Sequence, residues 1–262
     1  MNEYLEQHGG NIYRFVKEGN FHIEDVIDFS ASINPLGVPK GIYEKINDNI
    51  KFLCHYPDTE ARDLTQRIAK HLNVDPYHIL CGNGSTELIY LTVRAIKPKK
   101  VLIPAPTFSE YERASRLSDE TEVIYHKLNP EDNFDIHIDE FIDGIKKISC
   151  SFPSMAFLCN PNNPTGRLIR REDVLRVANA AKDFKCYLVV DEAFIDFVPE
   201  ESVISDVQNN PYLIVLRSMT KFYALSGIRI GYGLFPQSII NIIKRHKEPW
   251  TVNTIAQIAG IT

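Results

Sequence analysis

The chain has 262 residues, of which 44% are hydrophobic and 24% are charged, and its formal net charge is -5 at pH 7. This composition indicates a soluble globular protein, long enough for one large core or for one core with a smaller lobe. The acidic balance and the absence of a lysine- and arginine-rich run argue against a nucleic-acid partner. No apolar run approaches the roughly 20 residues that span a bilayer, so no membrane partner is expected.

Cysteine usage and the opening residues predict the compartment. Five cysteines are present and none forms a C-x-x-C pair. This favours a reduced setting over a disulfide framework or a structural zinc site, and no metal site is expected. Residues 1–11 are polar and charged, so no secretory signal is expected. We therefore expect a cytoplasmic protein.

Residues 1–45 are rich in glycine, proline and asparagine and show little periodicity. This pattern indicates an extended arm and loop. The alternative is an irregular tail, the common state of a chain terminus. Three apolar side chains of this stretch, Ile27, Phe29 and Ile33, are expected to be buried.

From residue 59 onward the pattern is regular. Apolar residues recur at helical spacing in residues 61–72, 88–95 and 174–181. Short apolar runs that read as strands lie at residues 101–103, 123–125, 156–158, 188–190 and 213–216. This alternation predicts an α/β fold, with a mostly parallel sheet and helices on both faces.

In such sheets ligands bind beyond the carboxyl ends of the strands, so the residues that follow each strand matter most. After the apolar run at 79–81, Gly84, Ser85 and Thr86 open a helix, where glycine and free N–H groups favour a phosphate. The spacing fits neither the Walker nor the dinucleotide pattern. A plain turn before a helix is the alternative.

Two further loops carry candidate ligand-binding side chains. Phe108 follows the strand at 101–103 and is suited to stack on a flat heterocycle, although a buried aromatic under a loop is the commoner explanation. Asn163 lies in a segment with two prolines and a glycine, and Pro164 holds it in an extended conformation. A rigid asparagine can donate a hydrogen bond to a ring oxygen.

Asp191 directly follows the apolar run at 187–190. A carboxylate in this position is costly unless it is paired, and a pyridinium nitrogen would be a suitable partner. A structural aspartate that caps a neighbouring helix is the alternative.

Lys221 follows a further apolar run, with Ser218 three positions before it and Arg229 eight positions after it. Desolvation and neighbouring cations would make its amine nucleophilic toward a carbonyl cofactor, with which it would form a Schiff base. Ser218 and Arg229 would hold the phosphate of that cofactor, the arginine through a two-pronged contact. The alternative is a solvated lysine with a helix-capping serine.

Together these residues describe a pocket for an aromatic, phosphorylated aldehyde. The chain resembles the fold-type-I pyridoxal-phosphate enzymes, and among them the histidinol-phosphate aminotransferases and threonine-phosphate decarboxylases. The resemblance covers the whole chain and is carried by Asn163-Pro164-Thr165-Gly166, Ser218-x-x-Lys221 and Arg229. It implies pyridoxal 5'-phosphate as the cofactor, bound covalently by Lys221. It also assigns the pyridine nitrogen to Asp191, the phenolic oxygen to Asn163, the ring face to Phe108, and the phosphate to Gly84, Ser85, Thr86, Ser218 and Arg229.

The resemblance further implies a domain organisation and an oligomeric state. Residues 46–240 would form an aspartate-aminotransferase-like large domain, with residues 1–45 as an arm and part of an incomplete small domain. Residues 241–262 would start an interdomain helix. Tyr56 matches a tyrosine that in relatives reaches the cofactor phosphate of the neighbouring subunit, so a homodimer is implied.

The chain departs from the family pattern in two respects. Many relatives have tyrosine where this chain has Phe194, so a second hydrogen bond to the phenolic oxygen is absent. Relatives are typically about a hundred residues longer, in keeping with common domain sizes. The additional part would supply arginines for the substrate carboxylate, so the chain is expected to be a fragment or a naturally shortened form, active or not.

The N-terminal arm is the best discriminator between the two activities. Residues 8–11 and 28–37 resemble the arm of the threonine-phosphate decarboxylases of cobalamin biosynthesis, and histidinol-phosphate aminotransferases usually lack the His-Gly-Gly-Asn segment. By that resemblance His8, Gly9 and Asn34 would lie near the phosphate of a small phosphorylated amino-acid substrate.

The predicted reaction is therefore the decarboxylation of L-threonine O-3-phosphate to (R)-1-aminopropan-2-yl phosphate. One alternative is an aminotransferase that acts on histidinol phosphate or an aromatic amino acid, and another is a non-catalytic, truncated relative. The expected catalytic residues Lys221, Asp191 and Asn163 serve both reactions, so they do not distinguish decarboxylase from aminotransferase.

Overall fold

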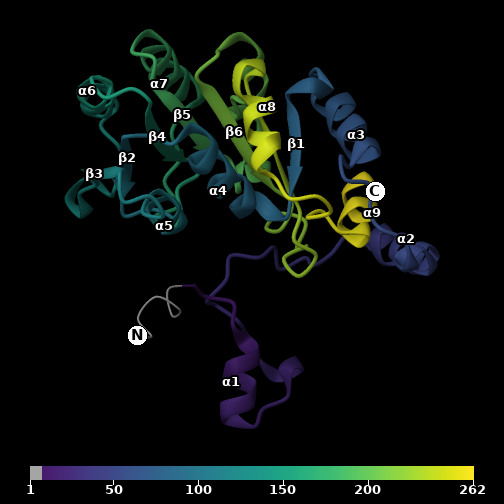
Figure 1. The fold of residues 1–262 in the computed structure, drawn as a ribbon. Helices are drawn as coiled ribbons and strands as arrows, with labels where there is room; N and C mark the ends of the chain where they lie inside the picture. Colours follow the sequence, from purple (N-terminus) through teal and green to yellow (C-terminus); the bar gives the residue numbers. More distant parts are fainter. Residues whose placement is uncertain (1–7) are drawn as a thin grey trace.

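A seven-stranded, mostly parallel sheet forms the centre of the computed structural model, which describes residues 8–262 (Figure 1). The strands lie in the order β1-β7-β6-β5-β4-β2-β3. β7 runs antiparallel to both of its neighbours, β1 and β6, and the other neighbouring strands are parallel. The strands are β1 (Ile79–Gly82), β2 (Lys100–Ala105), β3 (Glu122–Lys127), β4 (Ser154–Cys159), β5 (Tyr187–Asp191), β6 (Leu213–Ser218) and β7 (Gly231–Leu234). The predicted fold class is confirmed.

Helices cover both faces of the sheet (Figure 1). α4, α5 and α8 pack on one face, and α3, α6 and α7 pack on the other. α9 packs against both α2 and α3. The helices are α1 (Ile12–Gly19), α2 (Lys40–Asn49), α3 (Arg62–Leu72), α4 (Gly84–Ile96), α5 (Glu110–Ser115), α6 (Ile138–Ile148), α7 (Arg171–Asp183), α8 (Gln237–His246) and α9 (Thr254–Ile261).

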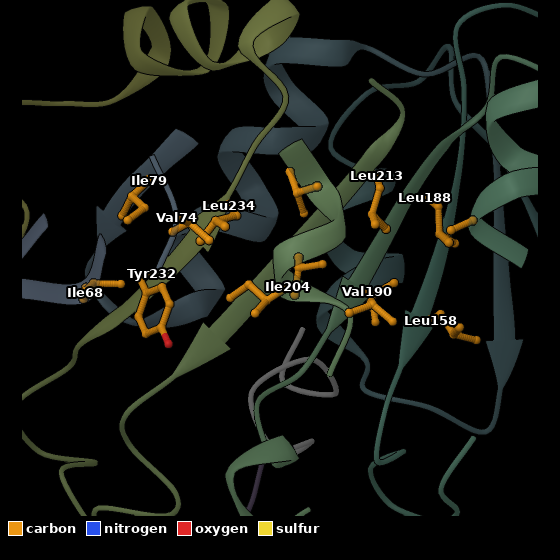
Figure 2. Packing of buried hydrophobic residues seen from close by; sticks show 14 of the residues in the cluster. Ile68, Val74, Ile79, Leu158, Leu188, Val190, Ile204, Leu213, Tyr232 and Leu234 are labelled. Carbon is orange, nitrogen blue, oxygen red and sulfur yellow. The ribbon is translucent and has the colours of Figure 1, made fainter. Parts of the chain in front are cut away.

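Successive side chains of β5 enter two different hydrophobic clusters. Leu188 and Val190 belong to one cluster and Val189 belongs to the other. Figure 2 shows the first cluster, where Leu188 and Val190 lie beside Leu158 of β4 and Leu213 of β6. A strand that is covered by helices on both faces must be apolar on both, which is why the central strands read as continuous apolar runs.

The predicted strands all lie within observed strands, from β2 to β6, and the predicted helical runs correspond to α3, α4 and α7. β7 was not predicted, because its sequence Gly-Tyr-Gly-Leu contains no apolar run. A Cβ atom at Gly231 would lie 2.5 Å from the backbone nitrogen of Ser85. Close packing against the start of α4, and not strand propensity, therefore requires glycine at this position.

The N-terminal arm differs from the prediction in two ways. It contains a helix, α1, which projects away from the sheet (Figure 1). The predicted burial of Ile27, Phe29 and Ile33 is wrong, since these residues are 82%, 94% and 38% exposed. An apolar side chain is buried only where another element covers it, and no element of residues 8–262 covers this part of the arm.

Residues 247–253 separate α8 from α9 near the end of the chain. The domain boundaries placed at residues 45 and 240 remain predictions. Among the helices of residues 8–262, none has the length and apolar character that crossing a membrane requires.

Leu188→Ala is expected to destabilise the fold by about 2–5 kcal/mol, because it removes a fully buried side chain from between helices and strands that can close the gap only in part. Urea denaturation of the variant and the wild type measures this difference. Leu117→Ala is the control, since Leu117 is 69% exposed and its loss should change stability by less than about 0.5 kcal/mol. Equal effects of the two substitutions would contradict the packing described for β5.

Candidate functional site

A cavity of about 720 Å³ lies beyond the carboxyl ends of β4, β5 and β6 and the amino end of α4. Most of the residues predicted for the site line it together, although they are far apart in the sequence. These lining residues are His8, Gly9, Ser85, Thr86, Phe108, Asn163, Asp191, Ser218, Lys221 and Arg229. The parallel strands explain this gathering, since their carboxyl ends meet at one edge of the sheet.

Asp191 ends β5 and is 2% exposed. Its Oδ2 accepts a hydrogen bond from the Tyr111 hydroxyl (2.8 Å), and its Oδ1 accepts one from the backbone N–H of Ala193 (3.0 Å). Burial raises the pKa of Asp191 to about 6, although these two hydrogen bonds oppose the shift. Both donors are neutral, so within the described residues the carboxylate has no ion-pair partner and could accept a cationic group.

Lys221 lies three residues beyond the end of β6 and is half-buried. Its Nζ is 6.0 Å from the centroid of the Phe194 ring. Burial and the nearby guanidinium of Arg229 lower the pKa of Lys221, while Asp191 opposes the shift. A lowered pKa leaves more of the amine unprotonated, which is the nucleophilic form.

The start of α4 faces Arg229. Gly84 has a φ of 74°, and a Cβ atom there would lie 2.7 Å from Arg229 Nη2. The Ser218 hydroxyl lies nearby on the same cavity wall and shares a hydrogen bond with the Thr220 hydroxyl (2.7 Å). Free N–H groups at a helix start, a guanidinium and hydroxyl groups are all groups that bind anions in proteins, so this arrangement is suited to a phosphate.

The loop that carries Asn163 is fastened to the loop that carries Phe108. Asn162 donates through Nδ2 to the carbonyl of Pro106 (3.1 Å) and accepts at Oδ1 from the Thr107 hydroxyl (2.7 Å). Asn163 and Phe108 therefore have defined positions on the cavity wall.

Three predicted residues, Gly84, Asn34 and Tyr56, lie outside the cavity lining, and Gly84 borders it beside Ser85 and Arg229. Asn34 donates through Nδ2 to the carbonyl of Phe222 (2.8 Å) and through its backbone N–H to the carbonyl of Lys221 (3.1 Å), so it supports the turn that carries the lysine. Tyr56 is 82% exposed, and its ring centroid is 4.8 Å from that of Trp250. A role of Tyr56 in a neighbouring subunit remains a prediction.

The structure adds side chains that sequence reasoning did not assign. Tyr111 is fully buried, stacks on Phe157 with a centroid distance of 4.7 Å, and binds Asp191 across 80 positions of sequence. The other added lining residues include Glu110, Arg113 and Thr220. In the sequence, the only indication that Glu110 and Tyr111 belong to the site is their position directly after the loop that carries Phe108.

A buried arginine balances the second carboxylate of this region. Arg217 Nε lies 2.8 Å from Glu192 Oε2, and Arg217 Nη1 lies 2.7 Å from Asp196 Oδ1. Arg217 and Glu192 are 5% and 1% exposed. Glu192 directly follows Asp191, so the two carboxylates repel each other. The pairing of Glu192 with Arg217 reduces this repulsion.

Comparison with known proteins shows the family and the fold. The sequence profile described as aminotransferase class I and II matches residues 24–262. The threonine-phosphate decarboxylase of Salmonella typhimurium is 37% identical over 255 residues, which cover 97% of this chain and 68% of the relative. The histidinol-phosphate aminotransferase of Desulfitobacterium hafniense is 36% identical over 244 residues, which cover 91% of this chain and 66% of the relative.

Among solved structures, the histidinol-phosphate aminotransferase from Clostridium acetobutylicum matches with a TM-score of 0.81 and 35% identity. The match covers 90% of this chain and 68% of that structure. The chain thus spans about two thirds of the length of these relatives. Relatives named for two different activities share this fold, so the fold alone does not separate the activities.

We expect Lys221 to react with an aromatic aldehyde at lower pH than an ordinary lysine does, because burial and Arg229 lower its pKa below 10.5. The absorbance of the resulting Schiff base should rise with pH as the free amine forms, with a midpoint below 10.5. Lys221→Ala should remove this signal, and Lys45→Ala, at an exposed position, should retain it. A midpoint at or above 10.5 would contradict the described environment.

Gly84→Ala is expected to weaken the binding of inorganic phosphate about tenfold, a change of about 1.4 kcal/mol. The added methyl group would displace Arg229, and the positive φ of 74° would be strained. Calorimetric titration measures the affinity. Gly166→Ala is the matched control, since Gly166 has a φ of 70° but no atom within 4 Å of the added Cβ. Equal losses in both variants would show that strain alone is responsible.

Proposed function

We propose, from the premise that this chain belongs to the class I and II aminotransferase family, that it acts in the decarboxylation of L-threonine O-3-phosphate to (R)-1-aminopropan-2-yl phosphate. Its cofactor is pyridoxal 5'-phosphate, the cofactor of this family. Because the chain spans about two thirds of its relatives, the activity of the whole protein is part of the proposal.

The donor set of the cavity fits this cofactor. At Gly84 a Cβ atom would meet Arg229, so the glycine leaves the room that a phosphate needs beside its donors. Ser85, Thr86 and Ser218 also line the cavity and would complete the phosphate site. Asp191, a buried carboxylate whose donors in residues 8–262 are neutral, would accept the hydrogen of the protonated pyridine nitrogen.

When bound, pyridoxal 5'-phosphate withdraws electrons from the substrate's alpha carbon and so weakens the bonds at that carbon. Asp191 would keep the pyridine nitrogen protonated, which strengthens this withdrawal. Asn163 would donate to the phenolic oxygen, and Phe108 would cover the ring face. Phe194 has no hydroxyl group, so it adds no second donor to the phenolic oxygen.

Lys221 would hold the cofactor through its amine and then carry a proton at the substrate's alpha carbon. Its lowered pKa suits both tasks, because the amine must lose a proton to attack and must exchange protons near neutral pH. In a decarboxylation the ammonium form of Lys221 donates a proton to the carbon that has lost the carboxylate. In a transamination the neutral form of Lys221 would first remove a proton from the alpha carbon, which would keep its carboxylate.

The position and the sequence of the N-terminal arm favour a decarboxylase over an aminotransferase. His8, Gly9, Ser30 and Ser32 line the same cavity as Lys221, and the sequence of this arm resembles that of threonine-phosphate decarboxylases. Polar groups at this wall would bind the phosphate of the substrate. Histidinol-phosphate aminotransferase activity is the alternative, and the retained Lys221 argues against a non-catalytic relative.

We further propose that the protein is a cytoplasmic homodimer and that its reaction is a step of cobalamin biosynthesis. Tyr56 would reach the cofactor phosphate of the other subunit, and its 82% exposure in the single chain leaves the ring accessible for such a contact.

The full-length protein, loaded with pyridoxal 5'-phosphate, is expected to release carbon dioxide from L-threonine O-3-phosphate without a keto-acid acceptor. Lys221→Ala should lower kcat by at least about 100-fold, because it removes the proton carrier. Manometric assay and mass spectrometry of the amine product measure both results, with Lys45→Ala as the control.

Two other results would support the alternative functions. Turnover of histidinol phosphate that depends on 2-oxoglutarate, without carbon dioxide release, would favour the aminotransferase. A protein that stays colourless with pyridoxal 5'-phosphate and is unchanged by borohydride would favour a non-catalytic relative.

A further inference from the structure

The N-terminal arm meets the cavity wall at one buried carboxylate, that of Glu110. Glu110 is the first residue of α5 and is 5% exposed. Its Oε1 lies 2.7 Å from His8 Nε2, and its Oε2 accepts a hydrogen bond from the Tyr90 hydroxyl at 2.6 Å. Arg113 Nη1 lies 3.5 Å from the same Oε1. The arm, α4 and α5 are therefore joined at this one side chain.

The arm is attached a second time, at the turn that carries Lys221. There the two hydrogen bonds of Asn34 to the carbonyls of Lys221 and Phe222 hold it. His8 lies at the first attachment and Lys221 at the second, and both line the cavity. Between the attachments, residues 8–9 and 30–32 line the cavity, whereas α1 projects away from it (Figure 1).

Residues 8–10 and 30–32 act as one unit between these attachments. A Cβ atom at Gly9 would lie 1.7 Å from the carbonyl oxygen of Ser30, and the backbone N–H of Gly10 donates to Ser30 Oγ at 2.7 Å. Placing His8 therefore also places residues 30–32, which line the cavity.

We propose that Glu110 is a positioning residue that fastens the arm across the cavity and thereby raises the affinity for a phosphorylated substrate. The arm needs such a contact because its apolar side chains at Ile27 and Phe29 are exposed and give it no core of its own. The substrate part of this statement rests on the proposed function, whereas the fastening of the arm does not.

The charge of Glu110 is central to the contact. Burial raises the pKa of Glu110, but hydrogen bonds from Tyr90 and His8 outweigh burial and lower it below its usual value. A charged acceptor forms a stronger hydrogen bond than a neutral one. Glutamine at this position would keep the volume and the contact with Tyr90 but would lose the charge.

Hydrogen exchange of the cofactor-free protein tests the fastening directly. In Glu110→Gln, amide hydrogens of residues 8–34 should exchange about three- to tenfold faster than in the wild type, the range expected for losing one partly exposed hydrogen bond to a charged group. Unchanged exchange in this segment would overturn the proposal. An unchanged urea midpoint would show that the variant is folded.

Two further variants separate fastening of the arm from local packing. Tyr90→Phe removes the hydroxyl partner of Glu110 but leaves its contacts with His8 and Arg113, so the arm should exchange at the wild-type rate. Glu112→Gln changes a carboxylate of the same helix that pairs with Arg116 and not with the arm, and it should also have no effect. Faster exchange of the arm in Tyr90→Phe, equal to that in Glu110→Gln, would overturn the proposal.

Kinetics of the holoenzyme test the effect on the substrate. Glu110→Gln should raise KM for L-threonine O-3-phosphate about three- to tenfold, more than it lowers kcat, and it should leave the absorbance of the bound cofactor in place. The double variant with His8→Gln should be no worse than the poorer single variant, because both break one contact. Additive effects would overturn the proposal.

Failure of this inference and failure of the proposed function give different results. If threonine phosphate is not a substrate, the exchange experiment still reports on the arm. If the arm exchanges normally in Glu110→Gln, the cofactor and decarboxylation assays of the wild type are unaffected.

Discussion

The site is built around a carboxylate that is buried at the end of a strand and that has no ion-pair partner among residues 8–262. Asp191 is 2% exposed, and its raised pKa of about 6 reflects the cost of keeping its charge away from water. Tyr111 and the Ala193 N–H reduce that cost, and Arg217 neutralises the adjacent Glu192. A buried carboxylate of this kind favours a cationic partner, which is why we propose that it pairs with a protonated pyridine nitrogen.

The anion site depends on close approach between backbones. β7 passes so near the start of α4 that a Cβ atom at Gly231 would lie 2.5 Å from the Ser85 nitrogen. On the other side of the same helix start, Gly84 leaves space for the guanidinium of Arg229. These two glycines allow β7 to approach the start of α4 closely. The backbone N–H groups of the helix start and the guanidinium of Arg229 therefore lie close together.

The groups that we propose for the cofactor and those that we propose for the substrate come from different parts of the chain. Asp191 and Lys221 follow strands that are buried on both faces, so the sheet holds them rigidly. His8 belongs to an arm that lacks its own core and is held by Glu110.

The sequence by itself determined the central strands and the polar residues that end them. Asp191, Asn163 and Lys221 each follow or adjoin an apolar run, which is a local pattern set by burial on both faces of a strand. Only the tertiary structure decided that β7 exists, that Tyr111 binds Asp191 and that Glu110 holds His8, a contact between residues 102 positions apart. It also decided that Ile27 and Phe29 are exposed. The physical reason is that these features depend on which distant element lies opposite, and neither periodicity nor residue type along the chain carries that information.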